Sequence, residues 1–172
     1  MRKIGAARAL DPWRWIGIPT ALCMVLTLIL GIPFRAFGWP LPEPVWAMAP
    51  AFAWAVIRPA ALSPLALLVM GEFMDVFWGS PLGLWSLSLL IAYGAVLSAR
   101  NMLVGQSRWM LWFWYGVTCT IGELAGFLFT RLDVEQTPNL IAVLWQLIAT
   151  IVIYPFAYRL IDRYEDADVR FR

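Results

Sequence analysis

The sequence contains no histidine and only two cysteines, Cys23 and Cys119. The lack of histidine removes the commonest general base and the commonest transition-metal ligand. The two cysteines lie far apart, each inside an apolar run, and form no metal-binding spacing. We therefore expect both to be small buried side chains, and we expect neither a metal site nor a bound cofactor.

Charge is also scarce. Charged residues make up 14% of the chain and hydrophobic residues 62%, against about 25% and about 45–50% in soluble domains. A soluble fold of 172 residues could not bury so much apolar surface. The composition predicts one integral membrane domain, residues 1–172, with membrane lipid as its surroundings and no nucleic-acid partner.

The apolar residues are gathered into six runs. A helix needs roughly 20 apolar residues to cross a hydrocarbon layer of about 30 Å. The runs are residues 16–34, 44–57, 60–78, 82–99, 109–130 and 140–160. They predict an all-α bundle of six transmembrane helices over residues 16–160, preceded by a basic arm (residues 1–15) and followed by a charged tail (residues 161–172). The first run is longer than a signal-peptide core, so we expect a retained helix.

The second run is the shortest and carries Pro44 and Pro50. Proline removes a backbone donor and bends a helix. We therefore expect a short, proline-broken helix that either crosses the membrane or re-enters on the same side, shielded by its neighbours.

The basic residues favour six crossings with both termini in the cytoplasm. In that topology only Arg35 and Arg131 lie outside, so 13 − 2 = 11 basic residues lie inside. Loops rich in arginine and lysine stay in the cytoplasm, which makes this asymmetry strong support for the orientation. The inside residues are Arg2, Lys3, Arg8, Arg14, Arg58, Arg100, Arg108, Arg159, Arg163, Arg170 and Arg172.

Three carboxyl groups fall inside the predicted spans, namely Glu72, Asp75 and Glu123. Ionisable residues inside a membrane are costly and often mark function. In the predicted topology all three belong to the outer half, with Tyr93 on the helix between them, so we expect one intramembrane polar cluster packed between the third, fourth and fifth helices. Its available basic partners are Arg35 and Arg131. Interhelical hydrogen bonding, ligand or ion binding, and catalysis all remain open for this cluster.

Two other patterns concern packing. Gly122 and Gly126 have the spacing that lets two membrane helices approach closely, and a homodimer stays open on this basis. Ser86, Tyr93 and Arg100 recur at seven-residue steps and form a polar stripe. No nucleophile–base set, phosphate loop or metalloprotease motif accompanies the carboxyls, so we predict no catalytic residues and no enzyme activity.

The end of the third run and the start of the fourth carry Gly71, Asp75, Gly79, Pro81 and Gly83. Glycine and proline suit a tight reversal here, and Asp75 is placed to accept hydrogen bonds from backbone N–H groups at the turn or at the next helix start.

This spacing resembles the signature of the rod shape-determining protein MreD family. Trp54 with Pro59, Tyr93, Glu123 and the pair Tyr154-Pro155 fit further family positions, whereas Glu72 departs from the pattern, since that position is usually apolar.

The resemblance implies a non-enzymatic scaffold in the bacterial inner membrane, acting in cell elongation and peptidoglycan synthesis. It implies MreC as a partner, together with RodA, its transpeptidase partner and MreB filaments. Proteins of this family look similar in fold to the S components of energy-coupling-factor transporters. The alternative function is therefore a solute-binding membrane subunit of a vitamin-type transporter.

Overall fold

The computed structural model describes residues 13–31, 35–36, 39–40, 43–57, 59–134 and 139–169. Within these residues the fold is all-helical apart from one minimal antiparallel pair, in which Arg35 faces Pro40 and Ala36 faces Trp39. The elements are the π-helical turn η1 (Trp13–Gly17), α1 (Ile18–Leu30), β1 (Arg35–Ala36), β2 (Trp39–Pro40), α2 (Met48–Ile57), α3 (Leu62–Trp78), α4 (Leu84–Leu103), α5 (Arg108–Val134), α6 (Leu140–Val152) and α7 (Tyr154–Val169).

The helices coincide with the six predicted runs, with differences at their ends. The first helical turn begins at Trp13, inside the predicted basic arm, and α7 continues through the first part of the predicted tail to Val169. The sixth run contains two helices that meet at Ile153. Pro155 accounts for this break, because proline has no N–H to donate to the preceding turn.

Three stretches are long and apolar enough to cross a membrane: Trp13–Leu30, Leu84–Leu103 and Leu140–Asp162. The surface agrees with such an environment. On α6, Leu140, Ile141 and Leu144 are each more than half exposed, and α1 and α3 carry similar apolar faces. Exposed apolar area on this scale indicates contact with lipid or with partner proteins.

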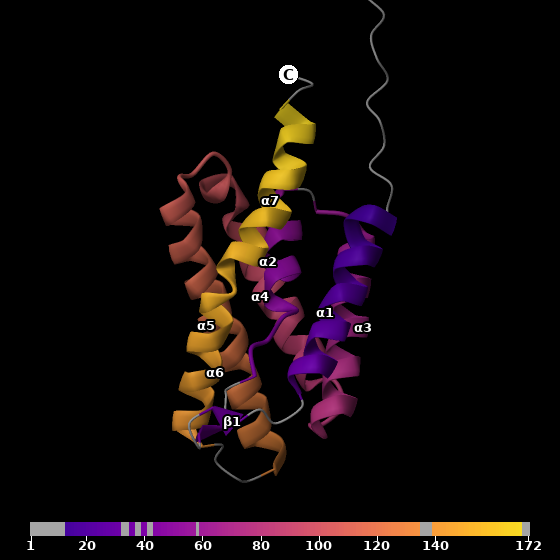
Figure 1. Cartoon of the computed structure of the whole chain (residues 1–172), viewed down its shortest axis with the longest axis vertical. Coiled ribbons are helices and arrows are strands. Elements are labelled where there is room, and N and C mark those ends of the chain that lie inside the picture. The colour runs from indigo at the N-terminus through magenta and orange to yellow at the C-terminus, as the bar shows by residue number, and fades with distance from the viewer. Residues whose placement is uncertain are drawn as a thin grey trace, which may run out of the picture.

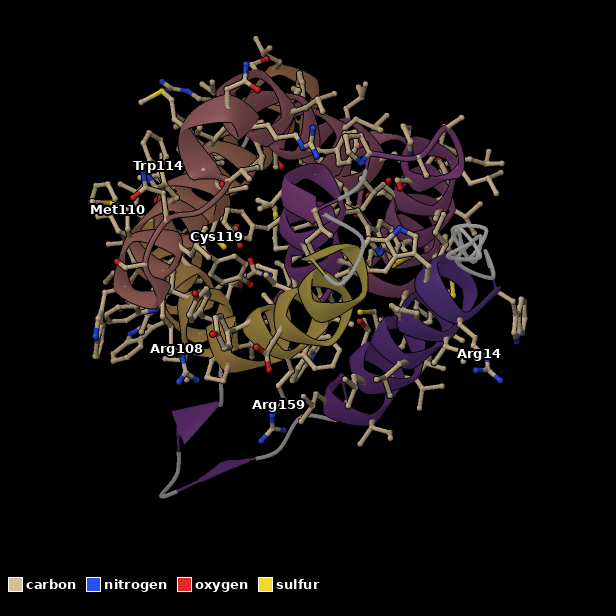
Figure 2. The ribbon with its side chains drawn as sticks, turned by 90° about the horizontal axis from the view of Figure 1, so that it is seen from above. Arg14, Arg108, Met110, Trp114, Cys119 and Arg159 are labelled. Carbon is tan, nitrogen blue, oxygen red and sulfur yellow. The ribbon has the colours of Figure 1, made fainter. Side chains whose placement is uncertain are left out.

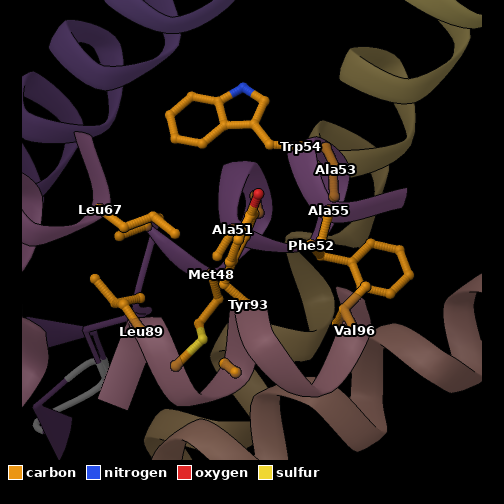
Figure 3. Close-up of a cluster of buried hydrophobic side chains, with 14 of the residues drawn as sticks. Met48, Ala51, Phe52, Ala53, Trp54, Ala55, Leu67, Leu89, Tyr93 and Val96 are labelled. Atoms are coloured by element: carbon orange, nitrogen blue, oxygen red, sulfur yellow. The ribbon is translucent and has the colours of Figure 1, made fainter. Parts of the chain in front are cut away.

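Helix α2 lies at the centre of the bundle (Figure 1), where it packs against α4 and α7. Every residue from Met48 to Val56 is buried. Phe52 and Trp54 are fully enclosed, and Leu89 and Val96 of α4 lie against the same cluster (Figure 3). The shortest of the predicted helices is thus the core of the structure.

The predicted proline break in this helix does not occur. Helix α2 begins only at Met48, four residues after Pro44, and Pro50 occupies its third position. The first N–H groups of a helix have no intrahelical acceptor, so a proline there removes no hydrogen bond. The ten residues of α2 are about 15 Å long, too short to cross a membrane alone.

Residues 43–47, which precede α2, extend its path along the bundle. At one end, Trp78 Nε1 in the last turn of α3 donates to Glu43 Oε2 at 2.8 Å. At the other end, Arg100 near the end of α4 donates from Nε to Val56 O at 3.0 Å and from Nη2 to Ile57 O at 2.9 Å. Because α3 and α4 are antiparallel, residues 43–57 join opposite ends of the bundle. Five non-helical residues add at most about 16 Å to the helix.

Non-helical backbone within a membrane needs acceptors and donors from the protein itself. Thr150 Oγ1 on α6 accepts the Val45 N–H at 3.0 Å, and the Cys23 thiol on α1 donates to Trp46 O at 3.6 Å. Pro44 has no N–H to satisfy. Thr150 is also joined to α5, because its carbonyl accepts the Tyr115 hydroxyl at 3.2 Å. Side chains of α6 and α1 thus bind residues 43–47, and α5 in turn binds Thr150.

We predict that Thr150→Val destabilises the fold by about 1–3 kcal/mol, the cost of leaving a buried N–H unpaired. Unfolding free energy measured by denaturant titration in bicelles tests this. Thr120→Val is the matched control, since the exposed Thr120 hydroxyl donates only to Gly116 O within its own helix. Equal stability of the two variants would contradict the proposed role of Thr150.

Candidate functional site

The turn between α3 and α4 depends on two glycines. Gly79 has φ +68° and Gly83 has φ +90°, both in the left-handed region that glycine enters without steric cost. Gly79 ends α3 and donates its N–H to Asp75 O, as does Ser80 at 3.0 Å. Pro81 lies between them and its carbonyl accepts the Leu84 N–H at 3.1 Å. The backbone therefore reverses within five residues.

The carboxylate of Asp75 holds this turn together. Its Oδ1 accepts the Ser80 hydroxyl at 2.7 Å and the Trp85 N–H at 3.1 Å, and its Oδ2 accepts the Gly83 N–H at 2.9 Å. The side chain is fully buried. Gly83 stands at the N-cap of α4 and has no side chain to cap it, so an aspartate from the preceding helix does so. A negative charge there also suits the positive end of the helix dipole.

These contacts confirm the hypothesis that Asp75 accepts hydrogen bonds from the turn and from the start of the next helix. Both oxygens are occupied by groups of the same chain. The geometry makes Asp75 a residue that fixes the position of α4 relative to α3.

Gly71 and Ser86 form a close contact between the same two helices. A Cβ on Gly71 would clash with the Cα and N of Ser86. The Ser86 hydroxyl lies 3.0 Å from Leu68 O and 3.2 Å from Glu72 Oε1. The sequence singled out Gly71 through its motif position alone, and its steric role becomes visible only when α4 is in place.

The structure divides the predicted polar cluster between two interfaces. Glu72 and Asp75 lie against α4 through Ser86 and the turn, whereas Glu123 lies on α5, which packs against another face of α4. Ser86 and Ser88 illustrate the reason. Two residues along a helix differ by about 200° in direction, so Ser86 faces α3 while Ser88 faces Gly126 of α5.

Glu123 is only 4% exposed, and its Oε1 has no hydrogen-bond partner among the described residues. Tyr93 is also buried, but it lies seven residues, or about 10 Å, further along α4 than Ser86. Nowhere in the described ranges do three His, Cys, Asp or Glu side chains come together closely enough to hold a metal ion.

The expected basic partners are not among the groups that donate hydrogen bonds to Asp75. Arg131 is exposed on α5, and the side chain of Arg35 lies outside the described part of the structure. Arg100 is instead the basic residue with described partners in the core, because it donates to the two carbonyls at the end of α2. The predicted polar stripe contained Arg100, but its acceptors 43 and 44 residues earlier in the chain had no sequence signal.

Gly122 and Gly126 serve packing within the chain. A Cβ on Gly122 would clash with the Met48 side chain of α2 and lie 3.4 Å from Ala92 Cβ of α4, and one on Gly126 would lie 3.3 Å from Ser88 Oγ. These two glycines therefore let α5 approach α4 and α2, and they are not available as a homodimer face.

Comparison of the chain with family models, with curated proteins and with solved structures finds no match.

We predict that Gly71→Ala separates α3 from α4 and lowers the free energy of unfolding by about 2 kcal/mol or more, as overpacking does. Gly94→Ala on α4 is the matched control. A Cβ there meets no atom within 4 Å, so the variant should be neutral, or more stable by up to about 1 kcal/mol from helix propensity. Denaturant titration in bicelles measures both. A Gly71→Ala protein as stable as Gly94→Ala would refute the close contact.

Proposed function

We propose that the chain is a multi-pass protein of the bacterial inner membrane with six crossings and both termini in the cytoplasm. Passage of residues 43–57 between opposite ends of the bundle supports an even number of crossings. Helix α7 and the start of α1 lie at one end of the bundle, with the β pair at the other (Figure 1). Arg14, Arg108 and Arg159 point outward in the view from that first end (Figure 2).

Within that membrane we propose a non-enzymatic scaffold of the cell-elongation complex. The observation that carries this proposal is the turn centred on Asp75. Gly71, Asp75, Gly79, Pro81 and Gly83 carry the resemblance to the MreD family, and each has a positioning role at the α3–α4 junction. A motif that fixes two helices in one arrangement suits a protein whose task is to present a rigid surface.

The partners implied by the resemblance are MreC, RodA with its transpeptidase, and MreB filaments. Such a subunit would contact MreC and RodA within the plane of the membrane, because the described part of the chain between α3 and α5 has only short connections. The exposed apolar faces of α1, α3 and α6 offer area for such contacts.

A solute-binding transporter subunit is the second candidate, and one observation favours it. The unpartnered Oε1 of Glu123 on α5 is a buried acceptor, and a polar solute could supply its missing donor.

We expect depletion of the protein to turn rod-shaped cells round, and the tagged protein to co-purify with MreC. A copy with Asp75→Leu should fail to restore shape because the turn is lost, while Glu123→Gln should restore it. Unchanged rods together with no MreC in the purified sample would reject the scaffold. Solute uptake that depends on Glu123 would favour the transporter subunit instead.

A further inference from the structure

Glu72 lies on the outward face of α3. It is half-buried, and its neighbours on the same face are exposed apolar residues: Leu65 at 57%, Leu68 at 41%, Val69 at 47% and Val76 at 73%. Helix α3 runs antiparallel to α4 and packs along it, and α4 is one of the three stretches able to cross a membrane. The surroundings of Glu72 outside the protein are therefore those of the membrane.

The depth of Glu72 places it below the lipid headgroups. It lies six residues before Trp78, or about 9 Å along the helix, and ten residues after Leu62, or about 15 Å. Trp78 and Trp85 are in edge-to-face contact at the turn, with ring centroids 5.2 Å apart, and tryptophan prefers the headgroup level. A carboxyl group about 9 Å beneath that level lies in hydrocarbon, where polar groups need partners.

The chain satisfies this carboxyl only in part. The Ser86 hydroxyl has one hydrogen, and both Glu72 Oε1 at 3.2 Å and Leu68 O at 3.0 Å compete for it. The described residues provide no hydrogen bond to the second oxygen. Asp75, one turn away, accepts three. The contrast points to a donor that comes from outside the chain.

The nature of that donor follows from chemistry. Acyl chains carry no hydrogen-bond donor. In a two-fold dimer formed by this face, the same patch meets itself, which would bring two Glu72 carboxyls together. A transmembrane helix from another protein can present an amide or a basic side chain at the required depth. Gly94 on the neighbouring α4, with open space around it, also lets a second backbone come close.

We propose that the α3 face centred on Glu72 binds a transmembrane helix of a partner protein through a hydrogen-bond donor, amide or basic, at the depth of Glu72. This rests on the membrane embedding proposed above, and it holds whatever the partner complex is. The role belongs to Glu72 alone among the three intramembrane carboxyls, because Asp75 is saturated and Glu123 is enclosed.

Synthetic transmembrane peptides test the proposal directly. The full-length protein carries a donor fluorophore in phosphatidylcholine vesicles, and three polyleucine peptides carry an acceptor: one with a central asparagine, one with a central arginine and one with neither. We expect the asparagine and arginine peptides to associate about 3- to 30-fold more tightly than polyleucine.

Variants identify the residue responsible. In the Glu72→Leu protein, association of the asparagine and arginine peptides should fall to the level of polyleucine. The Glu72→Gln protein should still bind the asparagine peptide more tightly than polyleucine, but it should lose most of the extra affinity for the arginine peptide. Glu123→Gln is the matched control and should change nothing. Equal association of all three peptides with the wild-type protein would overturn the proposal. So would energy transfer between two copies of the chain that Glu72→Leu abolishes, because it would make a second copy the occupant.

One further measurement distinguishes failure of this proposal from failure of the membrane topology on which it rests. Protease accessibility of tags at the two termini is read on the same vesicles. Termini on opposite sides would contradict the six crossings, whereas termini on one side with equal peptide association would contradict only the Glu72 surface.

Discussion

The carboxylate of Asp75 and the N-terminus of α4 form the contact on which the arrangement of the bundle depends. Helix α4 packs against α2, α3 and α5, so its direction sets the positions of all three. Its N-cap residue, Gly83, has no side chain to cap the helix, and the capping oxygens come from one turn before the end of α3. Because Asp75 is fully buried, no water replaces a missing acceptor, which makes this contact more consequential than the same cap on a solvent-exposed helix.

The same constraint explains the core. Residues 43–47 are not helical, so their backbone groups need partners that the segment cannot supply itself. Thr150 and Cys23 provide them from α6 and α1, and Arg100 occupies the carbonyls at the other end of α2. A ten-residue helix can therefore lie fully buried at the centre of a bundle whose outer faces are apolar. The polar side chains of the core thus hold the backbone in position, and the apolar outer surface remains for contact with lipid and partners.

Much of this could be predicted from sequence because it follows from local patterns. Hydropathy located the helices, and glycine and proline located the turn at residues 79–83. Asp75 could be predicted because the groups that donate to it lie within ten residues. The partnership of Val45 and Thr150 spans 105 residues and has no local signal. The prediction of a single polar cluster rested on position along the helices and did not consider direction around α4, and direction decides which interface a side chain enters.

The most direct test of the account is the stability of Asp75 variants in bicelles. Asparagine retains one oxygen, which can serve Ser80 and Trp85, but it turns an NH₂ group toward the Gly83 N–H. Leucine retains no acceptor. We expect the free energy of unfolding to fall by about 3 kcal/mol or more for Asp75→Leu and by roughly half that for Asp75→Asn, with faster hydrogen exchange at the Gly83 and Trp85 amides. An Asp75→Leu protein with wild-type stability and unchanged exchange at these amides would contradict the claim that the bundle depends on the Asp75 carboxylate.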